Sequence, residues 1–248
     1  MTIFYFTATG NSLDAAKQLG AKFPNAQLRS IPQERDTIGA SEDAIGVVFP
    51  VFAANIPAIV TRFLRRVNLK ANYKFAVAVH GGDPGPIGGV LARISDFDNV
   101  FDVETWSNYL PFNPDIPPVA TDISGDIEQI AETIRARKTQ KFKPDGGEPF
   151  DAAPWRLQAL DYRWRKDCTA CGTCMRVCPV ANYTISEDER DENGVPLFKF
   201  SARCEGCMAC LQNCPAAALH MPNEPTRYRY RNPNVTLSEI IAANEQKF

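Results

Sequence analysis

The 248-residue chain lacks most features that would assign it to a membrane, secreted or nucleic-acid-binding class. It has no run of about 20 apolar residues, because Pro50, Asn55 and Pro57 interrupt its longest uncharged stretch, residues 44–60. Its first residues lack the basic segment and small-residue cleavage site of a secretory signal. With a net charge of -2, it has no polybasic tract for nucleic acid or a lipid surface. We therefore expect a cytoplasmic protein with no membrane span and no nucleic-acid partner.

Cysteine is absent except in two short motifs, residues 168–179 (the first motif) and 204–215 (the second motif). Both read C-x2-C-x2-C-x3-C-P, at an offset of 36 residues from Cys168 to Cys204. A disulfide framework needs no repeated spacing, and clustered cysteines in a reducing cytosol are typically metal ligands. Structural zinc is the alternative, but zinc sites usually separate two C-x2-C pairs by a longer loop and often use histidine. Because the chain has only two histidines, the spacing favours iron–sulfur clusters.

Residues 160–222 resemble the bacterial-type ferredoxin family through these two motifs. The resemblance implies two [4Fe-4S] clusters, each held by three cysteines of one motif and the last cysteine of the other. The implied ligands are Cys168, Cys171, Cys174 and Cys214 for one cluster, and Cys204, Cys207, Cys210 and Cys178 for the other. Small loop residues such as Ala170 and Gly206 leave room for cluster sulfurs and for N–H···S bonds.

The first part of the chain alternates strand-like and helix-like segments. Apolar strands are expected at 2–6, 26–31, 44–49, 74–80 and 99–106, and helices at 11–23, 57–67, 90–94 and 122–138. Near-continuous apolar strands separated by helices predict a parallel sheet that is covered on both faces.

Composition divides the chain into four parts. We expect an α/β domain over 1–140, a linker over 141–158, a small α+β domain over 159–222 and a tail over 223–248. A short helix at 154–165 is expected to lead into the cysteine region, and Asn193-Gly194 suits a hairpin turn there. Thr236 with Glu239 fits a capping box that opens a tail helix. Because this tail carries alternating tyrosines and an apolar helix face, we expect it to pack back on the first domain.

A polar turn, "TATGNS", follows the first strand and opens the first helix. It matches neither the pattern of a P-loop nor that of a G-x-G-x-x-G loop. Free amides at such a helix start can cradle a phosphate, although a turn that merely caps the helix is an alternative. The turn resembles the phosphate loop of flavodoxins, which bind FMN. The resemblance implies phosphate contacts from Thr7, Ala8, Thr9, Gly10, Asn11 and Ser12.

Two further loops follow the third and fourth expected strands, where ligands of open parallel sheets bind. We expect them to contact the flavin ring through Pro50, Val51, Phe52, Ala53, Ala54 and Asn55, and through His80, Gly81, Gly82 and Asp83. Simple loop packing of Phe52 is an alternative to stacking on the ring. For His80, a hydrogen-bonded position at the strand end is favoured over proton donation to the flavin.

Taken whole, the chain resembles the EFR1-type family of flavodoxin–ferredoxin fusions, through "TATGNS", "FPVF…IP", the twin cysteine motifs and "YRNP". The resemblance implies a flavodoxin-like doubly wound parallel sheet followed by a small α+β ferredoxin domain. It also implies FMN and two [4Fe-4S] clusters as cofactors. It further implies a role in anaerobic metabolism. It supplies neither a substrate nor an oligomeric state.

Two hypotheses for the function follow. In the first, the protein is an electron carrier that passes electrons between the clusters and FMN, and to or from a redox protein partner. In the second, it is a flavin-dependent oxidoreductase that reduces a small molecule at the FMN, with the clusters as an electron relay. Because the sequence offers no second nucleotide motif, no acid–base pair and no nucleophile beside a base, the carrier is favoured and no catalytic residue is assigned.

Overall fold

The computed structural model describes residues 1–34, 41–111, 115, 119–144, 153–192 and 194–245. Five parallel strands form one sheet in the order β2-β1-β3-β4-β5. The strands are β1 (Thr2–Tyr5), β2 (Gln27–Ser30), β3 (Ser41–Pro50), β4 (Lys70–His80) and β5 (Asn99–Glu104). This order is that of the flavodoxin-like doubly wound fold, so the predicted fold class is confirmed for this part of the chain.

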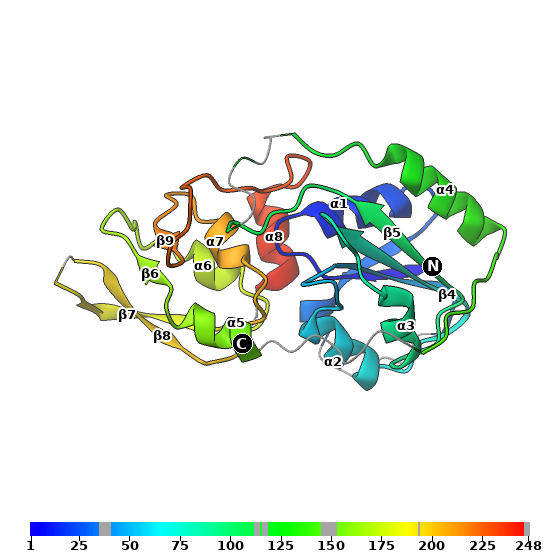
Figure 1. The fold of residues 1–248 in the computed structure, drawn as a ribbon, viewed down its shortest axis with the longest axis horizontal. Helices are drawn as coiled ribbons and strands as arrows, with labels where there is room; N and C mark the ends of the chain where they lie inside the picture. Colours follow the sequence, from blue (N-terminus) through cyan, green and yellow to red (C-terminus); the bar gives the residue numbers. More distant parts are fainter. Residues whose placement is uncertain (35–40, 112–114, 116–118, 145–152, 193, 246–248) are drawn as a thin grey trace.

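Helices cover both faces of this sheet (Figure 1). They are α1 (Asn11–Gly20), the short η1 (Ile31–Gln33), α2 (Ala58–Arg66), α3 (Ile87–Ala92) and α4 (Ser124–Arg135). Successive residues of a strand face opposite sides. In β3, Ile45 and Val47 therefore pack with α2 and α3, whereas Ala44 and Val48 pack with α1 and α4. Two apolar faces explain why the strands read as almost continuous apolar runs.

The cysteine region forms a second lobe beside the first (Figure 1). Its elements are α5 (Ala153–Ala159), β6 (Arg163–Trp164), α6 (Thr173–Arg176), β7 (Tyr183–Arg190), β8 (Pro196–Phe200), α7 (Ala209–Gln212) and β9 (Leu219–His220). Strands β7 and β8 form an antiparallel hairpin, whose expected turn residue Asn193 lies outside the described residues. Strands β6 and β9 pair and close the lobe.

The expected helix at 154–165 is wrong at its end. Helix α5 stops at Ala159, and Trp164 belongs to β6, where it pairs with Leu219. The Trp164 ring also stacks on Phe198, with ring centroids 3.5 Å apart. These long-range contacts of Trp164 override the local helical pattern.

Backbone conformation recurs at the same 36-residue offset as the two cysteine motifs. Positive φ angles occur in pairs at this offset: 53° at Ala170 and 68° at Gly206, 71° at Gly172 and 58° at Met208. Residues in this left-handed region cluster where a site constrains the chain. The two motifs therefore form matching loops, each followed by a short helix, α6 or α7.

The last described helix, α8 (Leu237–Asn244), lies between the two lobes (Figure 1). It contacts η1 of the first lobe and α6 of the second. The predicted capping box is confirmed: the Thr236 hydroxyl accepts from the Glu239 amide, and the Glu239 carboxylate accepts from the Thr236 amide. Within the described ranges, no helix is both long and apolar enough to cross a membrane.

Candidate functional site

A cavity of about 520 Å³ lies at the carboxyl ends of the parallel strands, beside the β1/β3 switch point; we name it the switch-point cavity. Crevices at this position are where doubly wound sheets bind ligands. Fourteen residues expected to contact a flavin line this cavity, whereas Gly10 and Asn55 do not. The fourteen are Thr7, Ala8, Thr9, Asn11, Ser12, Pro50, Val51, Phe52, Ala53, Ala54, His80, Gly81, Gly82 and Asp83.

The turn before α1 has the geometry of an anion cradle. Gly10 precedes the helix with a φ of 107°, and its amide donates to the Thr7 hydroxyl at 3.1 Å. The first amides of a helix have no acceptor within the helix, so they point outward to a ligand. The Ser12 hydroxyl is buried on the cavity wall and has no hydrogen-bond partner among the described residues. This unpartnered hydroxyl and the helix start fit a phosphate group.

The loop after β3 is a tight turn closed by two backbone hydrogen bonds between Phe52 and Asn55. Ala53 and Ala54, at its centre, have φ angles of 47° and 56°, the signs that a type I′ turn requires. The half-buried Phe52 ring lies edge-on to Phe6, with centroids 6.2 Å apart. Phe52 thus packs on the core of its own lobe and also forms part of the cavity wall.

The loop after β4 begins with His80, which is buried. Its Nδ1 lies within hydrogen-bond distance of the Gly82 carbonyl oxygen, and its Nε2 is 3.3 Å from an Asp102 carboxylate oxygen. Each ring nitrogen therefore faces an acceptor oxygen of the protein, and a neutral ring donates to one of the two. Glycine is required at position 81, because a Cβ atom added there would lie 2.3 Å from the backbone of Ser107 in the neighbouring loop.

Two parts of the cavity wall were not predicted from the sequence. The first is the loop after β5, which contributes Thr105, Trp106, Ser107, Asn108 and Tyr109. It carries no motif, and only its place at the end of a parallel strand signals the site. The second is a segment of the other lobe, Gly206, Cys207 and Met208, which comes from the second motif. The cysteine lobe therefore forms one wall of the switch-point cavity.

The eight cysteines, all of which the structure describes, form no disulfide and line two small cavities. The first cysteine cavity is lined by Cys168, Cys171, Cys174 and Cys214. The second cysteine cavity is lined by Cys178, Cys204, Cys207 and Cys210. Each cavity draws three cysteines from one motif and one from the other. Cys207 lines both the second cysteine cavity and the switch-point cavity, so these two spaces share a wall.

Hydrogen bonds to sulfur also follow the repeat. The Asn182 amide donates to Cys178 Sγ at 3.2 Å, and the Ala218 amide donates to Cys214 Sγ at 3.3 Å. The Gly206 amide lies 3.4 Å from Cys204 Sγ. Such donors stabilise anionic sulfur and tune iron–sulfur clusters.

The cysteine cavities suit a cage larger than one metal ion. In the described part of the chain, no three His, Cys, Asp or Glu side chains stand close enough together to hold a single ion. Burial raises the pKa of Cys174 to about 12, so its thiolate needs the positive charge of a metal. The residues present therefore fit a polynuclear iron–sulfur group better than zinc, which requires four ligands at about 2.3 Å.

Glu205, in the second motif, joins the two lobes. Its carboxylate accepts from the Ile59 amide at 2.9 Å, at the start of α2, and from Arg62 Nη2 at 2.6 Å. The Glu205 side chain is only 1% exposed. A carboxylate at a helix N-terminus is stabilised by the unpaired amides there. Because α2 follows the Phe52 loop, Glu205 ties the second motif to the wall of the switch-point cavity.

Strand order and cysteine motifs together define the class of the molecule: a flavodoxin-like α/β domain joined to an iron–sulfur ferredoxin domain. Residues 167–218 match the family model of the 4Fe-4S dicluster domain. A subunit of the F(420)H(2) dehydrogenase of Methanosarcina mazei is 37% identical over 62 residues, covering 23% of this chain and 18% of that protein. Pyruvate-flavodoxin oxidoreductase of Nostoc sp. is 27% identical over 159 residues, covering 51% of this chain and 13% of that protein. The chain thus spans less than a fifth of either relative.

Two solved structures, flavoprotein candidates from Bacteroides, are similar to about half of the chain. The protein from Bacteroides eggerthii is 18% identical with a TM-score of 0.38, covering 54% of this chain and 96% of that one. The protein from Bacteroides uniformis is 14% identical with the same TM-score of 0.38, covering 53% and 97%. This likeness is too distant to support a fold assignment, which rests on the strand order.

Proposed function

We propose that the protein is an electron carrier that passes electrons between two [4Fe-4S] clusters and FMN, and to or from a redox protein partner. The observation that carries the proposal is Cys207, a residue common to the walls of the second cysteine cavity and the switch-point cavity. A cluster ligand at this position leaves no intervening layer of protein between the two cofactor sites. We also propose membership of the EFR1-type fusion family, with domains at 1–140 and 159–222, a linker over 141–158 and a tail over 223–248.

We propose that one cluster is held by Cys168, Cys171, Cys174 and Cys214, and the other by Cys178, Cys204, Cys207 and Cys210. This division is supported by the two cysteine cavities, each lined by one of these sets. The amides of Asn182 and Ala218 would donate to the crossing ligands Cys178 and Cys214. Mixed ligation of this kind prevents either motif from assembling its cluster alone.

We propose FMN as the occupant of the switch-point cavity, with its phosphate at the Thr7–Ser12 turn. The unpartnered Ser12 hydroxyl and the free amides of α1 support this placement. Bound FMN exchanges one or two electrons, whereas each cluster exchanges one, and the protein controls their distance and surroundings. Met208, which is 5% exposed, lies next to Cys207 on the cavity wall and would make that side of the site apolar.

The oxidoreductase alternative needs a proton donor for a bound substrate. Among the described residues on the cavity wall, His80 is a buried titratable side chain, and its two ring nitrogens face the Gly82 carbonyl oxygen and the Asp102 carboxylate. This arrangement favours a structural role for His80 at the end of its strand. The carrier therefore remains the preferred function.

Anaerobic stopped-flow reduction tests the proposal. With a low-potential reductant, clusters and flavin should be reduced with coupled kinetics, and the transfer rate constant should not change with protein concentration. The iron, sulfide and FMN content of the purified protein should be measured on the same samples. A transfer rate proportional to protein concentration would contradict the proposal. Turnover of a small molecule without any partner protein would favour the oxidoreductase.

A further inference from the structure

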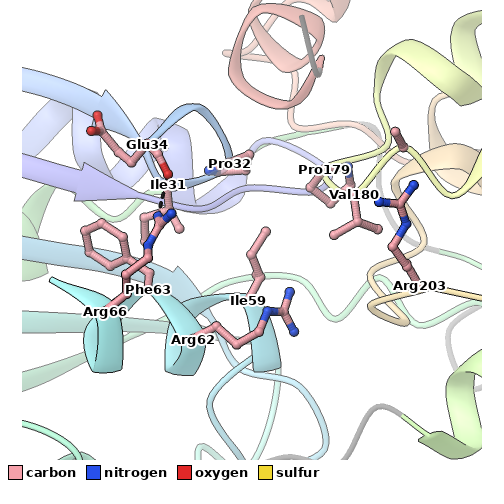
Figure 2. A pocket seen from close by; sticks show the side chains of 11 residues that line it. Ile31, Pro32, Glu34, Ile59, Arg62, Phe63, Arg66, Pro179, Val180 and Arg203 are labelled. Carbon is pink, nitrogen blue, oxygen red and sulfur yellow. Dashed lines mark hydrogen bonds between the residues drawn. The ribbon is translucent and has the colours of Figure 1, made fainter. Parts of the chain in front are cut away.

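A second large cavity opens at the junction of the two lobes. We name this cavity of about 500 Å³ the junction groove. Figure 2 shows its floor, formed by Ile59 from the first lobe and by Pro179 and Val180 from the second. Arginine side chains stand around this apolar floor (Figure 2). An apolar centre within a polar rim is the usual composition of a protein-binding surface.

Positive charge dominates the rim of the groove. Arg62 and Arg203 come from different lobes, and Arg66 lies farther along α2. The one carboxylate on the rim among the described residues, Glu34, forms a bidentate pair with Arg29 at 2.6 and 2.7 Å. Nearby Glu205 is buried and paired with Arg62. The acidic groups are thus already neutralised, and the groove presents excess positive charge to solvent.

Among the described residues, each of the two facing guanidinium groups makes one hydrogen bond within the protein. Arg62 donates through Nη2 to Glu205, and Arg203 donates through Nε to Ser201 at 3.0 Å. The Arg203 side chain is exposed, and that of Arg62 is 51% exposed. Each guanidinium therefore keeps further N–H groups for an external acceptor. A partly fixed guanidinium loses less conformational entropy when it binds a carboxylate.

The groove lies against the second cysteine cavity. Pro179 and Val180 line both spaces, and they follow Cys178 directly in the chain. Arg203 directly precedes Cys204 in the chain. The groove residues Pro179 and Arg203 are therefore each adjacent in sequence to a proposed cluster ligand. Pro179 and Val180 therefore form part of the wall between a partner seated in the groove and the second cysteine cavity.

We propose that the junction groove is the docking site of a redox protein with an acidic surface. That the partner is a redox protein rests on the proposed function. That the groove is a docking site follows from its positive charge and its position. A protein fits better than a small molecule because the rim is open to solvent and spans both lobes. Carboxylates of the partner would bind Arg62 and Arg203, and an apolar contact would cover Val180. Complementary charge of this kind mainly accelerates association and makes affinity sensitive to salt.

The test measures binding rather than electron transfer. A small acidic plant-type ferredoxin is the probe, with both proteins fully oxidised, and isothermal titration calorimetry gives the dissociation constant. We expect affinity to fall steeply between about 20 mM and about 200 mM salt, as exposed charges are screened. At low salt, Arg203→Glu should weaken binding about tenfold or more, whereas Arg203→Lys should retain most of it. Lys199→Glu is the matched control, because Lys199 is 74% exposed on β8, lies outside the groove and undergoes the same charge reversal. It should change affinity less than about twofold.

Three outcomes would overturn the proposal. In the first, Arg203→Glu and Lys199→Glu weaken binding equally, which means that only net charge matters. In the second, citrate at constant ionic strength binds the protein while the ferredoxin does not, which identifies a small-anion site. In the third, the protein self-associates and Arg203→Glu abolishes that association, which identifies a second copy as the occupant. No electron is transferred in this binding experiment. Its result is therefore independent of whether the stopped-flow experiment shows electron transfer between clusters and flavin.

Discussion

The two cysteine motifs share one ligand spacing but differ in what surrounds them. Thr169 of the first motif is exposed, whereas Glu205, its counterpart in the second, is buried and bonded to α2. Arg176 is exposed, whereas its counterpart Gln212 is 2% exposed and donates to the Asn108 carbonyl oxygen at 2.6 Å. The cysteines specify the cavities, and the residues between them determine which cavity meets the first lobe.

A second difference is the way in which each motif is tied to the first lobe. The second motif is tied directly: besides Glu205, the Asn213 side-chain amide donates to the Ala8 carbonyl oxygen at 3.1 Å. Among the described ion pairs, the first motif is linked through the tail, where Arg176 pairs with Glu245 just after α8. The direct tie is buried, and the indirect tie is exposed. We therefore expect the two to differ in strength and in sensitivity to solvent.

The largest expected effect tests whether the motifs exchange their last cysteines. Cys178→Ser should remove the same cluster as Cys204→Ser, because both side chains line the second cysteine cavity. Electron paramagnetic resonance of the reduced protein and iron and sulfide counts would identify the cluster that is lost. Cys214→Ser is the matched control and should affect the cluster of Cys168 instead. Loss of the Cys168 cluster in the Cys178→Ser variant would show that each motif binds its own cluster.

The next effect concerns the direct tie. Glu205→Ala should destabilise the protein by about 1–3 kcal/mol, less than for a fully buried ion pair because Arg62 can be rehydrated. For a chain of this size, that corresponds to a decrease of roughly 2–12 °C in the thermal midpoint. Intramolecular transfer between flavin and clusters should also slow, because the second motif is no longer fixed to α2. The matched change in the first motif, Thr169→Ala, should alter stability by less than about 0.5 kcal/mol. Equal effects of the two substitutions would remove the distinction between the motifs.

The third effect concerns the cavity that adjoins only the second motif. Ser12→Ala removes a buried hydroxyl that has no hydrogen-bond partner among the described residues, so it should weaken FMN binding roughly tenfold without destabilising the flavin-free protein. Thr61→Val is the control, because the Thr61 hydroxyl is also buried without a hydrogen-bond partner among the described residues but lies outside the switch-point cavity. Fluorescence titration with FMN would give both dissociation constants. Unchanged FMN affinity in Ser12→Ala would argue against a phosphate at this turn.

Local sequence patterns predicted the elements of the first lobe because strand burial and helix starts depend on nearby residues. The turn that opens α1 is an example in the first lobe, and the Thr236 capping box is a further example in the tail. The role of Glu205 was not predictable, since a glutamate between two cysteines indicates a solvated loop. Its burial depends on the start of α2, which lies 146 residues earlier in the chain. The same reason explains Trp164, whose strand pairing depends on Leu219.

The smallest expected effect concerns the exposed ion pair that links the tail helix α8 to the first lobe. Lys17 on α1 pairs with Glu239 of α8 at 2.7 Å, and both side chains are more than a third exposed. The hydrogen bond from Lys17, followed by those from Thr236, lowers the pKa of Glu239 to about 2. A lowered folded-state pKa contributes stability above the unfolded pKa of about 4.3, and this contribution disappears as the pH falls towards 2. Solvent screening limits it, so Glu239→Gln should cost only about 0.3–1 kcal/mol at pH 7 and less at high salt. Thermal unfolding of the parent protein and of Glu239→Gln, from pH 7 to about pH 3, would measure the difference between their free energies of unfolding. Acid affects the clusters of both proteins alike, so this effect cancels in the difference. A difference that grows on acidification would show that this pair does not hold the tail in place.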